Sequence, residues 1–186
     1  MNKKIMCLGL VSLLALMTVT NTVSATTTRF VPVQVNNEIA QEEEDNEIKL
    51  KIMELLDHLY IIYITLGEEY EDLLTQGYPT QDEAMVVLSL AKDLIKITIK
   101  KVENILCNID EWTLYELKAS MMDLLCTIET SIIVLFECYY QFLVEGRSPS
   151  DPVMKTIHST IDAIYNSMIE VQNIIIKVEN MIITQQ

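Results

Sequence analysis

Apolar residues recur at alternating spacings of three and four along most of the chain, most clearly between Ser150 and Gln186. This is the a and d pattern of a heptad repeat, typical of a helix that buries one stripe against other helices. The only proline of this run, Pro152, falls in its first turn, where a missing N–H removes no hydrogen bond. We predict a long helix that needs partners. Its seam positions are Met154, Ile157, Ile161, Ile164, Met168, Val171, Ile175, Val178 and Ile182.

Three further seams of the same kind precede it. Short segments around residues 77–80, 108–112 and 146–152 separate the four seams. Such short connections place consecutive helices antiparallel, and a repeat of 3.5 residues favours a left-handed supercoil. We therefore predict an all-α fold, a left-handed, antiparallel up-down-up-down four-helix bundle over residues 41–186. The added seams are Ile48, Ile52, Leu55, Leu59, Ile62, Leu66 and Leu73; Ala84, Leu88, Ala91, Ile95, Thr98, Val102 and Ile105; and Leu114, Leu117, Met121, Leu124, Ile128, Ser131, Leu135, Cys138 and Phe142.

Local signals predict where the helices begin and end. Gly77 and Gly146 suit the position just after a helix, where a positive φ is common. The first helix is expected to begin between Asn36 and Asn46, in a run of acids that suits a helix N-terminus. The other predicted starts are a capping box at Thr80–Glu83, a second at Thr113–Glu116, and an N-cap at Ser148 or Ser150.

Residues 1–25 have the pattern of a cleaved secretory signal peptide. Lys3 and Lys4 form a positive start, an apolar run follows, and the small residues Val23, Ser24 and Ala25 suit a cleavage site. The apolar run is shorter than the roughly 20 residues that span a bilayer. Residues 26–40 lack a helical pattern and are predicted to form an extended or disordered arm. The sequence thus predicts a secreted or extracytoplasmic protein, either extracellular or periplasmic.

Composition and charge narrow the function. Half of the residues are hydrophobic while Gly and Pro number four each, which favours helices over a turn-rich β fold. The net charge of −14 leaves no basic patch for phosphate groups, so we expect no nucleic-acid partner. The same acidity disfavours binding to an anionic membrane surface.

Motifs for catalysis or cofactor binding are missing from the sequence. Neither His58 nor His158 is preceded by glutamate at the spacing of a di-iron motif. The sequence contains no haem-attachment motif, no His-Glu-x-x-His motif and no glycine-rich phosphate loop. Methionines at seam positions are more typical of core packing than of haem ligation. We predict a non-enzyme without metal or cofactor.

Three cysteines follow the predicted signal peptide. Cys126 and Cys138 lie about 18 Å apart along one helix, which exceeds the roughly 7 Å between the Cα atoms of a disulfide. Cys107 ends the preceding helix, away from Cys126, so we predict no intramolecular disulfide. Cys126 points away from the seam and is the better candidate for an intermolecular bridge. Cys138 and His158 are expected to be packed neighbours.

The third helix carries a second apolar stripe, about 150° from its seam by the 100° step of a helix. A bundle helix usually has one apolar face, so a second one needs its own partner. A similar excess of apolar residues occurs at 60–64. The candidate interface residues are Met122, Cys126, Ile133, Phe136, Tyr140 and Leu143.

Three interpretations of this stripe remain open. It is covered within the monomer, or it binds a receptor or a second copy of the chain, or it meets lipid when the bundle opens. We expect a secreted bundle that acts by protein–protein interaction, as an effector, ligand or antigen, with self-association included. The alternative is a lipid-binding or membrane-active amphipathic helical protein.

A short repeat points to an internal duplication without establishing one. The tetrapeptide at 101–104 recurs at 177–180, near the ends of the second and fourth predicted helices. A four-residue repeat within helices arises by coincidence, and the heptad phases of the two helices differ. This recurrence alone therefore does not establish a duplication.

Overall fold

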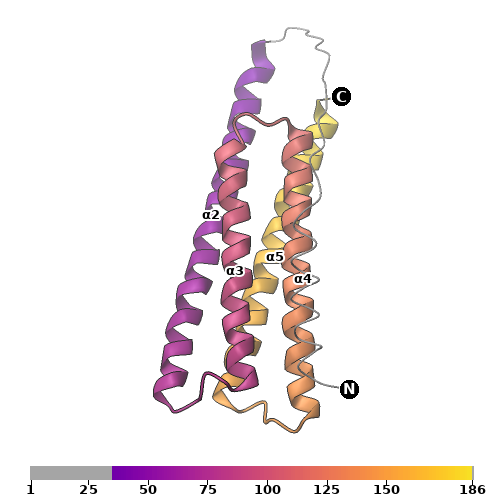
Figure 1. Cartoon of the computed structure of the whole chain (residues 1–186). Coiled ribbons are helices and arrows are strands. Elements are labelled where there is room, and N and C mark those ends of the chain that lie inside the picture. Colours follow the sequence, from indigo (N-terminus) through magenta and orange to yellow (C-terminus); the bar gives the residue numbers. More distant parts are fainter. Residues whose placement is uncertain (1–34, 186) are drawn as a thin grey trace. The chain divides into compact units, whose positions relative to one another are not determined.

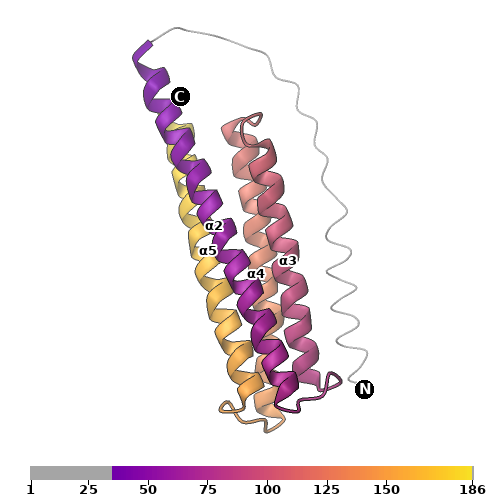
Figure 2. The same cartoon turned by 90° about the vertical axis from the view of Figure 1, so that its left-hand side faces the viewer.

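The computed structural model describes the backbone of residues 35–185 and the side chains of residues 46–185. The described residues form four α-helices and no strand: α2 Val35–Thr75, α3 Glu83–Asn108, α4 Leu114–Val144 and α5 Pro152–Thr184. The four helices lie side by side (Figures 1 and 2). The all-α prediction is confirmed. The predicted signal peptide lies outside the described residues, and so does the predicted arm as far as residue 34. Residues 35–40, which we assigned to that arm, belong to α2.

The predicted seams form the core. A fully buried leucine or isoleucine side chain contributes about 1.5–3 kcal/mol by leaving water, so these positions dominate the stability of the bundle. Four seam residues are only half-buried: Ile62, Leu114, Cys138 and Met168. The fully buried seam positions include Ile52, Leu55, Leu88, Val102, Met121, Leu124, Ile128, Met154, Val171 and Val178.

Ion pairs join the helices along their outer edges. Lys49 in the first half of α2 donates to Asp110, which follows α3, at 2.6–2.8 Å. Lys118 near the start of α4 pairs with Glu179 near the end of α5 at 2.9 Å. Among the pairs formed by α3, α4 and α5, the contact between α4 and α5 is the most extensive.

Two helices end in the Schellman geometry, as their glycines predict. Gly77 follows α2 with φ +94°, and Gly146 follows α4 with φ +91°. The N–H of Tyr78 donates to the carbonyl of Leu73, and the N–H of Arg147 donates to the carbonyl of Phe142. These bonds satisfy carbonyl groups that have no partner within the helix.

The helix starts agree with the sequence at one place and differ at two. The capping box of Thr113 and Glu116 forms at the start of α4. The start of α3 is capped by Asp82 instead of the predicted Thr80–Glu83 box. The start of α5 is capped by Asp151 instead of Ser148 or Ser150. Each aspartate accepts from a backbone N–H two residues later and adds a negative charge where the helix dipole favours it.

Candidate interaction surface on α4

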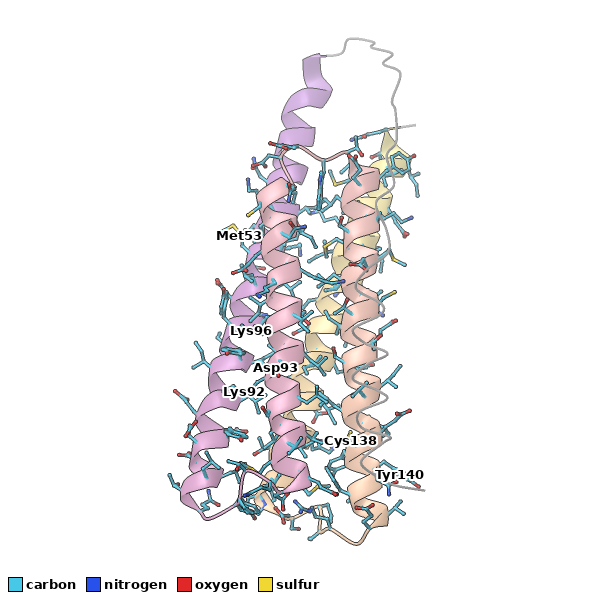
Figure 3. All side chains as sticks on the ribbon, viewed as in Figure 1. Met53, Lys92, Asp93, Lys96, Cys138 and Tyr140 are labelled. Carbon is cyan, nitrogen blue, oxygen red and sulfur yellow. The ribbon has the colours of Figure 1, made fainter. Side chains whose placement is uncertain are left out.

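The structure places most of the predicted interface residues on the outside of α4. Met122 is 42% exposed, Ile133 57%, Phe136 56% and Tyr140 60%, and Cys126 is exposed as well. Figure 3 shows Tyr140 pointing away from the other helices. We name Met122, Cys126, Ile133, Phe136 and Tyr140 the α4 outer stripe. Among the described residues, therefore, nothing covers the greater part of Ile133, Phe136 or Tyr140.

Two positions differ from the sequence-based list. Leu143 is only partly exposed and contributes less to the surface than its spacing predicts. Val144, which the sequence analysis did not include, is 64% exposed. It is the last residue of α4 and lies four residues after Tyr140, so the three-four spacing allows Val144 as well as Leu143.

The charge around the α4 outer stripe is negative. Glu129 and Glu137 are exposed on the same helix. Lys118 is the only basic residue of α4, and Glu179 already pairs with it. A partner that docks here meets an apolar strip that Glu129 interrupts and Glu137 borders.

α4 is also apolar enough to cross a membrane. It is the only helix of the described residues to reach that level, with a mean hydropathy of 1.7 over an 18-residue window. A third of that window is buried in the bundle. The core helices of soluble proteins reach the same values, so this apolarity fits both a buried helix with an exposed stripe and a helix that enters lipid.

α2 has a smaller exposed apolar surface. The sequence indicated an apolar excess at residues 60–64, and Ile61 and Ile64 are 59% and 55% exposed. Leu50 and Met53, which the sequence analysis did not single out, are 55% and 49% exposed. Tyr60 is 39% exposed, and its hydroxyl donates to Glu103 of α3 at 2.6 Å.

A cluster of polar side chains joins the two loops that follow α2 and α4. Arg147 donates to both carboxylate oxygens of Asp82 at 2.8 and 2.6 Å. The Tyr78 hydroxyl donates to Asp151 at 3.0 Å. The hydrogen bonds from Arg147 hold the pKa of Asp82 below its usual value. Burial, followed by the bond to Asp151, raises the pKa of Tyr78.

Sequence reasoning did not find this cluster. Its one visible signal is that Arg147 is the only arginine among residues 35–185. A shallow depression beside it is lined by Gln81, Glu83, Phe142 and Gly146, together with the Asp82–Arg147 pair. The charged groups of Asp82 and Arg147 already bind each other, so they are not available to bind a ligand in the depression.

Both histidines of residues 46–185 lie beside acidic side chains. His58 pairs with Glu170 at 2.9 Å, and His158 pairs with Asp162 at 3.0 Å. The ring of Tyr139 meets that of His158 edge-on, with centroids 5.5 Å apart. The cysteines from residue 46 onward form no disulfide bond. No group of three or more His, Cys, Asp or Glu in this part of the chain has the geometry to hold a metal ion.

Two lysines of α3 have partners on neighbouring helices. Lys92 lies over the rings of Tyr63 and Tyr70, 5.7 and 5.8 Å from their centroids. Lys101 pairs with Asp123 of α4. The position of the Lys92 ammonium group over two aromatic rings is that of a cation–π contact.

The comparisons with known proteins give no relative for this fold or this surface. No protein-family model, no curated protein and no solved structure matches the chain significantly.

Proposed function

We propose that the chain is a secreted protein that binds another protein through the α4 outer stripe, as an effector, ligand or antigen, and without catalysis. The observation that carries this proposal is the exposure of Ile133, Phe136 and Tyr140, each more than half accessible on one helix. Aromatic side chains that leave water at an interface are the usual anchors of protein–protein binding.

The proposal includes a left-handed bundle with antiparallel up-down-up-down order. Its support comes from the ion pairs at the helix ends, because Lys49 and Lys118 each reach a residue at the far end of the following helix. Heptad spacing in all four helices supports the left-handed supercoil. In this arrangement the outer face of α4, with the α4 outer stripe, faces away from the other helices.

The second candidate function is membrane or lipid binding. The hydropathy of α4 favours it. The acids beside the stripe and the net charge of −14 oppose it, since helices that lie on anionic membranes usually carry lysine and arginine beside their apolar face.

Light scattering after size exclusion, together with liposome flotation, tests the two functions. We expect no flotation, and either a self-associated species or capture of a protein partner that Phe136→Asp and Tyr140→Asp both weaken at least tenfold. An interfacial aromatic residue typically contributes about 2 kcal/mol or more, which corresponds to such a change.

Ile176→Asp is the matched control, because Ile176 is 54% exposed on α5, a different helix. It should leave binding unchanged. A monomer that floats with neutral liposomes would instead support the lipid function. If both α4 variants fold and keep every partner, the stripe is not the binding surface.

A further inference from the structure

The loop after α2 and the loop after α4 have the same geometry. Gly77 and Gly146 take φ values of +94° and +91°. Five residues later, the N-caps Asp82 and Asp151 have φ and ψ of −59° and 130°, and of −58° and 132°. In both loops the N-cap N–H donates to the carbonyl three residues earlier, at 2.9 and 3.0 Å. The two glycines are 69 residues apart, and a shift of 69 residues aligns the sequence of one loop with that of the other.

The same shift aligns the flanking helices without a gap. Eighteen of the 64 pairs between residues 45–108 and residues 114–177 are identical. Heptad patterning explains some of these identities, but it does not constrain exposed polar positions. Identical exposed polar pairs are Glu68 and Glu137, Asp93 and Asp162, and Asn104 and Asn173.

Burial follows the same alignment. At four identical core pairs the exposed fractions agree within one per cent: Leu55 with Leu124, Leu66 with Leu135, Met85 with Met154, and Val102 with Val171. Even the buried hydroxyls correspond. Thr98 and Ser167 are 69 residues apart, both are buried, and each donates to the carbonyl four residues earlier.

Ion pairs within the two hairpins also correspond. The pair Lys49–Asp110 shifted by 69 residues becomes the pair Lys118–Glu179, and the structure contains both. The first joins α2 to the end of α3, and the second joins α4 to the end of α5. The chain therefore builds the same hairpin twice, with an equivalent lysine–carboxylate pair linking its two helices.

The contacts between the hairpins are reciprocal. Tyr78 of the first loop donates to Asp151 of the second, and Arg147 of the second loop donates to Asp82 of the first. Tyr78 corresponds to Arg147, and Asp82 corresponds to Asp151. Each loop therefore donates a hydrogen bond from the first position of this pair to the second position in the other loop. Reciprocal contacts of this kind define the isologous interface of a two-fold symmetric dimer.

We propose that the bundle is a tandem duplication of one helical hairpin, and that the inner face of each hairpin fits a second copy of the same hairpin. The tetrapeptide repeat at 101–104 and 177–180 lies one heptad outside this alignment. α5 has 33 residues and α3 has 26, so the longer helix adds seven residues at its C-terminal end.

Replacing one helix by its equivalent tests the proposal in the full chain. In the test chimera, residues 45–75 replace α4, residues 114–144. This brings Glu47, Lys49 and Glu54 to positions 116, 118 and 123, where they preserve the capping box and the pairs with Glu179 and Lys101. We expect a cooperative thermal transition, measured by circular dichroism, within about 10 °C of the parent.

The matched control replaces α4 with residues 152–182, an equally long heptad segment from a helix that is not its equivalent. We expect this chimera to lose the cooperative transition. The reciprocal chimera, in which residues 114–144 replace residues 45–75, guards against failure of a single variant. The proposal is overturned if neither equivalent replacement melts cooperatively, or if the control melts like the parent. One cooperative equivalent chimera beside a failed control supports it.

Discussion

Asp82 combines two roles at one carboxylate: it caps α3, and it binds the guanidinium of Arg147 from the loop after α4. The side chains of Asp82 and Arg147 are 18% and 26% exposed, so water screens this pair less than it screens a surface ion pair. The two roles can be separated, because asparagine caps a helix about as well as aspartate but has no charge.

We predict that Asp82→Asn lowers the unfolding free energy at neutral pH by about 1–3 kcal/mol, the range for a partly buried hydrogen bond to a charged group. The pKa of Asp82 is lower in the folded state, so its contribution is complete above the unfolded-state value near 3.8 and is lost as the pH falls through the folded pKa. Urea unfolding of parent and variant over a pH series should give curves that converge in acid.

Asp151→Asn is the control for that experiment, since Asp151 also caps a helix but binds the neutral hydroxyl of Tyr78. Its effect should be smaller than that of Asp82→Asn. A difference between parent and Asp82→Asn that stays constant from neutral pH into acid would contradict the assignment to the charge of Asp82.

At the scale of the helix, the sequence predicted the seams, which follow a repeating spacing. It missed the caps at the starts of two helices, where residues distant in sequence come together. The seams of the four helices follow from spacing alone, because burial recurs every three or four residues. The caps at Asp82 and Asp151 depend on the loop conformation and on partners 65 and 73 residues away, which no local pattern records. The tetrapeptide repeat pointed to a duplication but is out of register with it, and the residues that are identical in register are scattered along the helices.

The α4 outer stripe was predictable because its residues follow the same helical step as the seam. Comparison with the equivalent helix α2 separates the stripe residues that both helices share from those that only α4 has. Met122 and Ile133 correspond to Met53 and Ile64 on α2, which are exposed to similar extents. Phe136 and Tyr140 correspond to Gly67 and Glu71, so these two aromatic residues are particular to α4.

The helix ends give a test with an internal control. Gly77→Ala and Gly146→Ala should each lower the unfolding free energy by about 1 kcal/mol, because a side chain is strained at their positive φ. Gly67→Ala should raise it by up to about 1 kcal/mol, since Gly67 is inside α2 and an added Cβ meets only the Lys92 side chain at 3.5 Å. Thermal or urea unfolding measures the stability of all three variants. Equal effects of the three substitutions would contradict the expected difference between the helix ends and the helix interior.

At the scale of the whole bundle, the segment between α3 and α4 is the only connection between the two hairpins. If each inner face fits another hairpin, shortening that connection should move the partner from the same chain to a second chain. We predict that deletion of residues 109–113, which fuses α3 with α4, converts the protein to a dimer in which two chains exchange hairpins. Light scattering should give twice the mass of the parent species.

Insertion of five glycine and serine residues at the same place is the control, and it should leave the parent mass unchanged. A folded deletion variant with the mass of the parent would show that the hairpins do not exchange.

The α2–α5 edge also determines how the molecule responds to mechanical load. Lys177, in the last turns of α5, pairs with Glu47 in α2. The first and the last of the four helices therefore meet at one end of the bundle (Figure 2). A force that separates residues 46 and 185 therefore peels α2 from α5 turn by turn, starting at this ion pair, and does not shear the whole length at once. We expect tension applied between these two points to open the molecule at lower force than tension applied between residue 46 and the α2–α3 loop, which stretches α2 along its axis.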